Sequence, residues 1–388
     1  MMLSENQEAH AQHQAAFLDT PDDAAKWLAG IKDTPELAVD TEGASFHRFV
    51  DRVYLLQLST REVNGIIDPL SVPAPAELGR LLESPDVEIV FHDADYDLRL
   101  LRQDYGWRVR HIFDTRVSAQ LLGIKSFGLG ALLEHYFGVK LEKKFQRADW
   151  SMRPLSQGML DYAVHDTAYL LELRDTMRAE LENAGRMEWA REEFERLEST
   201  QWSEAEDPDA FLRIKGTRDL TRRELALFRE LVKWRDEVAR VLDRATFRVV
   251  GNEALLEAAR KVPRSASDLI AVKGMPRALV ERAAGDIIAA LDRGLAVPDA
   301  ELPRFPRGAR WDRDPDFDEN VNRLKAVRDA AATRLELDPG VLCSRERLEL
   351  IARRKPRSVD DLREIDGLRR WQIGVLGEEM VHALSPYR

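Results

Sequence analysis

The chain has 388 residues, of which 44% are hydrophobic and 33% charged, a composition typical of a folded protein with two or three domains. No stretch reaches the roughly 18 consecutive apolar residues that a membrane-spanning helix needs, and the polar N-terminus lacks a signal-peptide pattern. The single cysteine, Cys343, excludes an internal disulfide and a cysteine-based zinc site. We therefore expect a cytoplasmic protein with no membrane partner, and we expect a monomer.

The net charge of −11 is unevenly distributed along the chain. Residues 1–200 hold 22 Lys and Arg against 35 Asp and Glu and carry −13, whereas residues 201–388 hold 36 against 34 and carry +2. The acidic half indicates either a solvated surface or a carboxylate cluster that needs divalent cations. In the second case, a polyanionic substrate would be reached through the metals and through the other half of the chain.

In the first half, short apolar runs alternate with amphipathic stretches. The runs predict strands at 37–40, 53–58, 65–68 and 88–91, and the amphipathic stretches predict helices at 76–82, 96–104, 116–122 and, as one long helix, 158–183. Strands in one block with helices between and after them predict a mixed α/β domain that ends near residue 195.

The second half contains an internal repeat. The pairs Pro263 and Pro356, Asp268 and Asp361, and Gly274 and Gly367 are each 93 residues apart, so the register holds without a gap. Each copy ends in an amphipathic helix, at 278–291 and 371–384. We therefore expect two small helical modules. A polar linker at 199–209 precedes the first module, and a segment rich in Pro, Arg and Asp at 297–318 connects the two.

Three separated segments carry acidic residues that could bind metal. Asp40 ends an apolar run and Glu42 follows at i+2, on the same face of a strand. Two carboxylates there repel each other unless a cation lies between them, although a solvated turn explains these residues equally well. Asp97 follows the strand at 88–91 and falls in the first or second turn of a helix, where Asp93 and Asp95 could be N-caps.

The third segment contains Tyr162 and Asp166, which are four residues apart and share one face of a helix. His165 lies roughly 100° around the helix from Asp166, so it should not share that face. By itself, a Tyr-x-x-x-Asp pair is more often part of a solvated surface than of a site.

The order Asp-x-Glu, Asp, Tyr-x-x-x-Asp resembles the DEDD exonuclease superfamily in its tyrosine subclass. Residues 38–42, 92–98, 113–115, 148–155 and 162–166 resemble segments of the ribonuclease D family, and the repeated modules resemble the HRDC domain. The resemblance implies an α/β ribonuclease H-like exonuclease domain, with a mixed sheet flanked by helices, followed by two all-α HRDC modules. The implied boundaries are a flexible tail at 1–15, the exonuclease domain at 16–198, a linker at 199–215, the first HRDC domain at 216–296, a linker at 297–317 and the second HRDC-like domain at 318–388.

The resemblance implies catalytic roles for Asp40, Glu42, Asp97, Tyr162 and Asp166. The four carboxylates would hold two divalent ions, Mg²⁺ or Mn²⁺, which prefer carboxylate oxygens. Asp40 would bridge both ions, Glu42 and Asp166 would hold the ion that carries the attacking water, and Asp97 would help to hold the other. Tyr162 would orient the water. The sister subclass uses a histidine five residues before the last aspartate, where this chain has an aspartate.

The same resemblance assigns Thr41, His92, Lys143, Lys144 and Arg147 to substrate binding. One of the two lysines could neutralise the scissile phosphate, but solvated surface charges explain these basic residues equally well. Asp114, in a Phe-Asp-Thr context, is expected to cap a helix or to support the site rather than to bind metal.

The implied function is a metal-dependent 3′→5′ exoribonuclease that trims structured RNA such as transfer-RNA precursors and releases nucleoside 5′-monophosphates. A DNA 3′→5′ exonuclease and a non-catalytic RNA-binding scaffold remain open as alternatives. The absence of a polymerase or helicase segment argues against the first, and the complete set of site residues argues against the second. No G-x-x-x-x-G-K-[ST] phosphate loop occurs, which excludes helicase activity. The basic residues of the HRDC-like modules could bind nucleic acid or protein.

Overall fold

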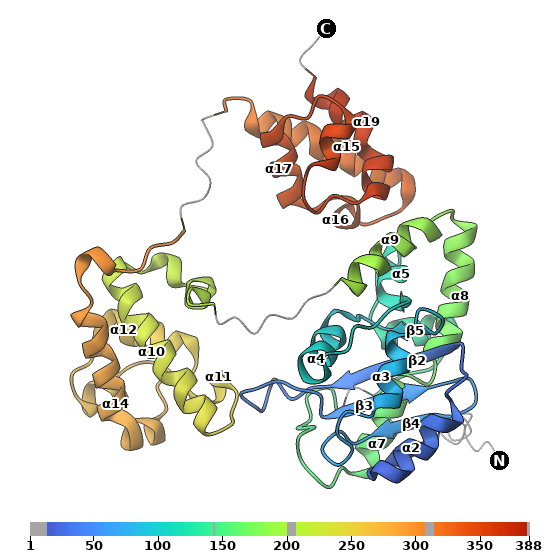
Figure 1. Cartoon of the computed structure of the whole chain (residues 1–388). Helices are drawn as coiled ribbons and strands as arrows, with labels where there is room; N and C mark the ends of the chain where they lie inside the picture. The colour runs from blue at the N-terminus through green and yellow to red at the C-terminus, as the bar shows by residue number, and fades with distance from the viewer. Residues whose placement is uncertain (1–13, 143, 200–206, 307–313, 386–388) are drawn as a thin grey trace, which may run out of the picture. The chain divides into compact units, whose positions relative to one another are not determined.

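The computed structural model describes residues 14–142, 144–199, 207–306 and 314–385 (Figure 1). The chain divides into two compact units: unit 1 contains residues 1–42, 53–202 and 311–388, and unit 2 contains residues 43–52 and 203–310. Within the described ranges, no helix is both long enough and apolar enough to cross a membrane.

Unit 1 contains a six-stranded sheet with the order β1-β4-β3-β2-β5-β6 (Figure 1). Its strands are β1 (Ala15–Leu18), β2 (Glu36–Glu42), β3 (Leu55–Ser59), β4 (Asn64–Ile67), β5 (Glu88–Phe91) and β6 (Ile112–Asp114). β3 is antiparallel to both β2 and β4, whereas β1 is parallel to β4, and β2, β5 and β6 are mutually parallel. The prediction of a mixed sheet is confirmed, and β2 lies in its interior.

The two faces of β2 contribute to two different cores, because successive side chains of a strand point to opposite faces. Leu37 and Val39 are buried in a core that includes residues of α2 (Pro21–Gly30), α3 (Ala76–Glu83) and α4 (Asp95–Tyr105). Ala38 is buried in the other core, with residues of α8 (Leu170–Asn183). Asp40 and Glu42 alternate in step with Ala38, so both side chains lie on the α8 face of the sheet.

Further helices complete the exonuclease-like part of unit 1: α5 (Thr115–Leu121), α6 (Leu129–Phe137), α7 (Gln157–His165) and α9 (Met187–Glu198). Four of the six strands were predicted from the sequence, whereas β1 and β6 were not. β6 has only three residues, too few for a two-residue periodicity to stand out. β1 is an edge strand paired with β4, 49 residues away, and local periodicity does not show that pairing.

The single long helix predicted over 158–183 is wrong. The structure has α7 and α8 instead, and Asp166 is the C-cap of α7. The next residue, Thr167, is buried, and its Oγ1 lies 2.7 Å from Oγ of Ser59 on β3. This hydrogen bond ties the chain to the sheet between the two helices, which a local pattern of apolar residues cannot show.

The second half of the described chain is helical, and the sequence repeat is also a structural repeat. Unit 2 contains α10 (Arg222–Val241), α11 (Thr246–Val249), α12 (Asn252–Lys261), α13 (Ala266–Ile270) and α14 (Arg277–Ala296); unit 1 contains α15 (Phe317–Leu335), α16 (Pro339–Leu342), α17 (Arg345–Arg354), α18 (Val359–Arg363) and α19 (Arg370–Leu384). The starts of α11 to α14 precede those of α16 to α19 by 93 residues each. Gly274 and Gly367 both have a φ of 81°, which favours glycine at this turn.

The expected linkers are partly folded. Phe211 and Leu212, expected in the linker 199–215, are buried in the core of unit 2. Leu302, expected in the linker 297–317, is also buried, and its carbonyl accepts a hydrogen bond from Arg222 at 2.8 Å. Apolar side chains inside polar stretches explain both differences. Within the two expected linkers, residues 200–206 and 307–313 lie outside the described ranges.

A segment expected in the exonuclease domain, residues 43–52, groups with unit 2. The Ala245 N–H donates to the His47 carbonyl at 3.1 Å, and Arg48 pairs with Asp243 at 3.3 Å. The segment follows directly on β2, so the chain that carries Glu42 continues into a loop that packs against the first helical module.

The second helical module packs against α9 within unit 1. The rings of Trp189 and Trp371 stack with centroids 4.8 Å apart. Glu193 accepts hydrogen bonds from the Trp371 indole N–H and from Arg369, each at 3.0 Å. This packing could not be predicted from the sequence, because contacts between positions about 180 residues apart leave no signal in local periodicity.

Candidate active site

Three of the predicted carboxylates converge on the α8 face of the sheet. Asp40 and Glu42 come from the end of β2, and Asp166 comes from the C-terminal end of α7. One oxygen of each carboxylate lies within 4.8 Å of the other two. Two elements more than 120 residues apart in sequence therefore build one acidic cluster.

Asp97 approaches the cluster from α4. Its Oδ1 accepts two hydrogen bonds from Thr41, from the backbone N–H at 3.0 Å and from Oγ1 at 2.5 Å. Asp97 is not among the three carboxylates that share the 4.8 Å separation. Its charge nevertheless contributes to the raised pKa values of Asp40, Glu42 and Asp166. The Thr41 side chain thus holds Asp97 beside the cluster, while its predicted role in substrate binding remains a prediction.

Asp114 accepts hydrogen bonds from backbone N–H groups at the starts of both α4 and α5. It is the N-cap of α5 and accepts from the N–H groups of Arg116 and Val117, as the sequence analysis expected of a capping residue. It also accepts from the Ala94 N–H at 2.7 Å, at the beginning of α4. The expected capping of α4 by Asp93 or Asp95 is wrong, because the N-cap position is Ala94 and the acceptor comes from Asp114 instead. One buried carboxylate thus ties together the starts of two helices, including the one that carries Asp97.

The cluster is electrostatically unfavourable without a cation. Burial, followed by the neighbouring carboxylates, raises the pKa of Asp40 and Glu42 well above their usual range. Burial raises the pKa of Asp97 and of Asp166 to about 7 each. Within the described ranges, no Lys or Arg forms an ion pair with any of the four. A group of one buried and three half-buried carboxylates with no basic partner fits a site for divalent cations, which would supply the missing positive charge.

The cluster should give the metal-free protein an unusual pH dependence. The folded-state pKa of Asp166 lies above its unfolded value, so the folded state binds the additional proton and its stability falls as the pH rises from about 4 to about 7. In the presence of EDTA, Asp166→Asn should therefore stabilise the protein more at pH 8 than at pH 5, by at least about 1 kcal/mol. Urea unfolding of both proteins at the two pH values measures this difference. An equal effect of the substitution at both pH values would contradict the electrostatic picture.

Tyr162 lies on α7, one helical turn before Asp166. Its ring packs against Phe145 and Trp150, with centroids 6.0 and 6.2 Å apart. Burial, and then the charges of Asp166, Glu42 and Asp40, raise the pKa of Tyr162, so the hydroxyl stays protonated at neutral pH and can donate a hydrogen bond. The Nδ1 atom of His165 lies 2.5 Å from the Asp161 carbonyl oxygen, and its ring stacks with that of Tyr169 at a centroid distance of 6.3 Å.

Arg153, which was not predicted from the sequence as a site residue, holds the loop that carries Trp150. Its guanidinium donates to both oxygens of the buried Asp68, at 2.6 and 2.7 Å, and to the carbonyl of Trp150 at 2.8 Å. Trp150 is 1% exposed and contacts Tyr162. Arg153 falls in the family-like segment 148–155, which was the available signal, but its partner Asp68 lies 85 residues away.

The predicted substrate-binding residues fall in different surroundings. His92 is hydrogen-bonded to Thr115 at 2.9 Å, and burial lowers its pKa to about 4, so the ring is neutral at pH 7. Lys144 is exposed, with Nζ 5.2 Å from the centroid of the Phe145 ring that contacts Tyr162. Arg147 is exposed in the same loop, and Lys143 lies outside the described residues. Their roles in binding substrate remain predictions.

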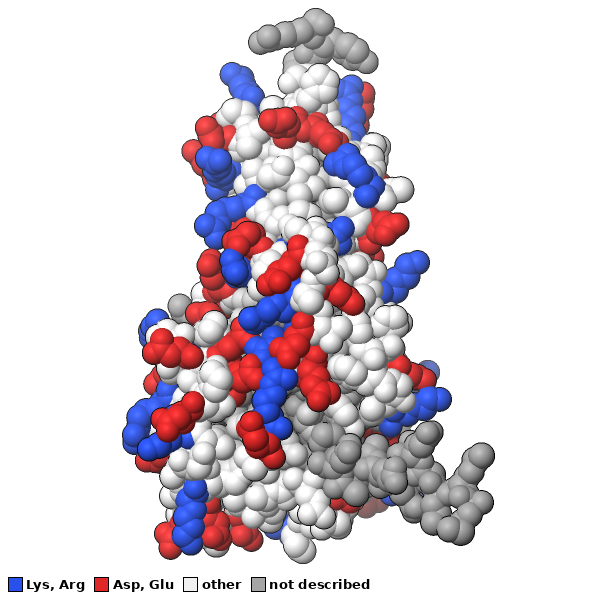
Figure 2. Space-filling view, turned by 90° about the vertical axis from the view of Figure 1, so that its right-hand side faces the viewer, with Lys and Arg blue, Asp and Glu red and all other residues white. Residues whose placement is uncertain are grey.

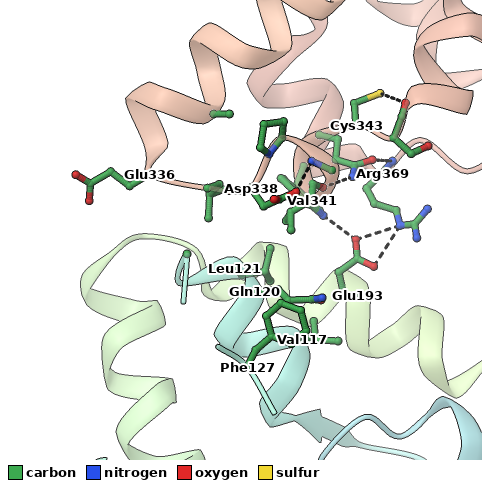
Figure 3. A pocket seen from close by; sticks show the side chains of 18 of the residues that line it. Val117, Gln120, Leu121, Phe127, Glu193, Glu336, Asp338, Val341, Cys343 and Arg369 are labelled. Atoms are coloured by element: carbon green, nitrogen blue, oxygen red, sulfur yellow. Dashed lines mark hydrogen bonds and ion pairs between the residues drawn. The ribbon is translucent and has the colours of Figure 1, made fainter. Parts of the chain in front are cut away.

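A pocket of about 1250 Å³ opens elsewhere in unit 1, between α5 and the second helical module (Figure 3). Val117, Gln120 and Leu121 line one side, and Asp338 and Val341 line the other. None of the predicted catalytic residues lines it. The pocket therefore belongs to the packing between two modules and is separate from the carboxylate cluster.

Comparisons with known families agree with the two parts of the architecture. Residues 16–182 match a 3'-5' exonuclease family model, and residues 224–291 and 318–384 each match the HRDC domain. The structure of Escherichia coli RNase D, described as an exoribonuclease involved in structured RNA processing, has the same fold, with a TM-score of 0.74, 24% identity, and 96% of this chain and 98% of that chain covered.

Two relatives extend over most of the chain. Ribonuclease D of Granulibacter bethesdensis is 28% identical over 92% of this chain and 89% of its own length. Ribonuclease D of Acidiphilium cryptum is 30% identical over 78% of each protein. The mixed sheet, the duplicated helical module and these matches together show that the chain belongs to the ribonuclease D family of nucleases, with a 3′–5′ exonuclease domain and two HRDC domains.

Proposed function

We propose that this protein is a 3′→5′ exoribonuclease that removes nucleotides from the 3′ ends of structured RNA, such as transfer-RNA precursors, by two-metal-ion hydrolysis. The observation that carries the proposal is the convergence of Asp40, Glu42 and Asp166 within 4.8 Å of one another. The match to ribonuclease D relatives gives the reaction class and RNA as the substrate. Transfer-RNA precursors come from the sequence resemblance.

The donor set suits Mg²⁺ or Mn²⁺, because hard divalent cations prefer carboxylate oxygens. Two such ions would lower the pKa of the attacking water and neutralise charge on the phosphate and the leaving oxygen. In this proposal Asp40 would contact both ions, and Glu42 and Asp166 would hold the one on the side of the attacking water, as the family resemblance implies. Asp97 would serve the other side, where Thr41 fixes one of its oxygens.

Tyr162 would orient the attacking water by hydrogen bonding and not by removing its proton. Its pKa is raised by burial and by the neighbouring carboxylates, so a tyrosinate base is disfavoured before metals bind. The Phe145 and Trp150 rings hold the phenol ring in place. The water's proton must then leave to another acceptor.

Substitution of Tyr162 tests this role. Tyr162→Phe removes the hydroxyl and keeps the ring packing, so kcat should fall about 10- to 100-fold while the Kd for RNA changes little. Tyr136→Phe is a matched control, because Tyr136 donates to Glu180 at 2.7 Å on α8 and should lose no activity. A Tyr162→Phe protein with parental kcat, together with an inactive His165→Ala protein, would transfer the role to His165.

Unit 2 offers a surface suited to a single RNA strand. Phe46 and Phe247 are 46% and 54% exposed, and their rings meet edge to face with centroids 6.4 Å apart. The guanidinium of Arg248 lies 6.0 Å from the centroid of the Phe247 ring. Exposed aromatic rings beside a cation can stack bases and pair with phosphates without reading sequence. On the face that Figure 2 shows, by contrast, acidic and basic side chains are interspersed. The described part of that face therefore has no continuous basic surface to which an RNA backbone could bind.

The direct test of the proposed function compares RNA and DNA substrates. In Mg²⁺, the full-length protein should shorten a 3′-extended transfer RNA one nucleotide at a time and release nucleoside 5′-monophosphates, which chromatography identifies. A DNA of the same sequence should be degraded at least about tenfold more slowly, a difference of about 1.4 kcal/mol in the barrier. Preferential degradation of the DNA would support the DNA exonuclease instead. RNA binding without any product would support the scaffold.

A further inference from the structure

Gln57 on β3 is an anomaly in the core of unit 1. Its side chain is 0% exposed, and neither the amide nitrogen nor the amide oxygen has a hydrogen-bond partner among the described residues. Leaving a buried polar group unpaired lowers the stability of the folded state, so such groups usually have a partner or a function. A leucine or methionine would fill the same space without this cost.

The position of Gln57 explains what the amide could serve. In the antiparallel pair of β2 and β3, Gln57 lies directly opposite Asp40. Residues opposite each other in such a pair point to the same face, with Cβ atoms about 4.5–5.5 Å apart. Gln57 is therefore the cross-strand neighbour of the carboxylate that is proposed to bridge both metal ions. On its other side, Gln57 pairs with the buried Ile66 of β4.

The face that carries Gln57 is covered by α7. This helix packs against β1, β3 and β4 (Figure 1). Ser59, two residues along β3 and therefore on the same face as Gln57, hydrogen-bonds Thr167 just after Asp166. Ala163, inside α7, is fully buried. The unpaired amide thus lies in the interior between the sheet and the end of α7, beside Asp40 and shielded from solvent.

We propose that Gln57 is a positioning residue for Asp40, whose side-chain N–H donates to the Asp40 carboxylate when the site is loaded with metal. The proposal rests on the proposed metal-dependent function and goes beyond it by assigning a residue outside the five catalytic positions. A carboxylate that binds metal must be ionised and held in one orientation, and a neutral donor from the neighbouring strand provides both without adding a competing charge. Replacing such supporting partners typically costs 10- to 100-fold in metal affinity or activity.

The test replaces the amide by apolar side chains of similar size. Gln57→Met and Gln57→Leu differ in shape but both lack a donor, and Ile66→Leu is the matched control because it alters the neighbouring position of the same core. Isothermal titration of each full-length protein with Mn²⁺ measures affinity, and electron paramagnetic resonance of bound Mn²⁺ reports on the ligand environment. Urea unfolding in EDTA measures the stability of the metal-free proteins.

Both Gln57 variants should bind Mn²⁺ about 10- to 100-fold more weakly than the parent, with an altered resonance spectrum. Their stability in EDTA should equal or exceed that of the parent, because an unpaired polar group has been removed. The Mg²⁺ concentration for half-maximal kcat should rise, and KM for RNA should not change. Ile66→Leu should match the parent in all metal measurements.

Parental Mn²⁺ affinity in both Gln57 variants would overturn the proposal and leave Gln57 as a packing residue. Weakened binding in only one variant would also overturn it, because side-chain shape and not the lost donor would be the cause. Failure of the parent itself to bind Mn²⁺ would contradict the proposed metal-dependent function, so the two ideas fail in distinguishable ways.

Discussion

Removal of divalent cations should abolish RNA hydrolysis by this protein. The four carboxylates at the site contribute negative charge to a reaction between a hydroxide-like nucleophile and an anionic phosphodiester. Without cations, whichever of Asp40, Glu42, Asp97 and Asp166 are ionised would repel both reactants, and the protonated ones could hold no metal. In EDTA the rate should therefore fall by at least about 1000-fold, which corresponds to about 4 kcal/mol in the barrier.

The measurement is the release of nucleotides from a 3′-extended transfer RNA in EDTA and after metal is added back. Mg²⁺ or Mn²⁺ should restore the rate, whereas the same concentration of NaCl should not. RNA binding should be followed in parallel, since loss of binding alone would lower the rate at limiting RNA but not at saturation. Undiminished hydrolysis in excess EDTA would refute metal-ion catalysis for this site.

Asp40→Asn should lower the rate of hydrolysis by a similar factor, although it replaces only one carboxylate oxygen by an amide nitrogen. Asp40 is the one carboxylate proposed to contact both metal ions, and an amide neither carries the charge nor offers two equivalent oxygens. We expect kcat to fall by at least about 1000-fold, with the affinity for Mn²⁺ strongly reduced. Because Asp40 is half-buried beside like charges, the substituted protein should be at least as stable as the parent in EDTA, which chemical denaturation measures.

Asp161→Asn provides the matched control for Asp40→Asn. Asp161 is an exposed carboxylate on the same helix as Tyr162, and it accepts a hydrogen bond from Gln157 at 2.8 Å. Its substitution also removes one negative charge near the site but should leave kcat and Mn²⁺ affinity within about twofold, because exposed charges interact weakly through water. Equal losses in both proteins would mean that net charge, and not metal ligation, decides activity.

The sequence by itself determined the class of the fold and the identities of the acidic residues. Strand β5 was predicted over its full range, 88–91, because the consecutive apolar residues Ile89 to Phe91 form a pattern that a short stretch of sequence shows by itself. The 93-residue repeat was equally visible, because both copies keep the same capping and turn residues, including Gly274 and Gly367. Asp40 and Glu42 could be placed on one face, since a strand alternates with a fixed period of two residues.

The tertiary structure alone decided how these residues meet. The break between α7 and α8 places Asp166 at a helix end instead of a helix middle, and just after it the hydroxyls of Thr167 and Ser59, 108 residues apart in sequence, are hydrogen-bonded to each other. Likewise, the pairing of Asp97 with Thr41, of Arg153 with Asp68 and of Gln57 with Asp40 is fixed by strand register and helix packing. Local patterns report which face a side chain occupies, but the neighbour across the sheet is chosen by the global packing of the cores, which no short window of sequence contains.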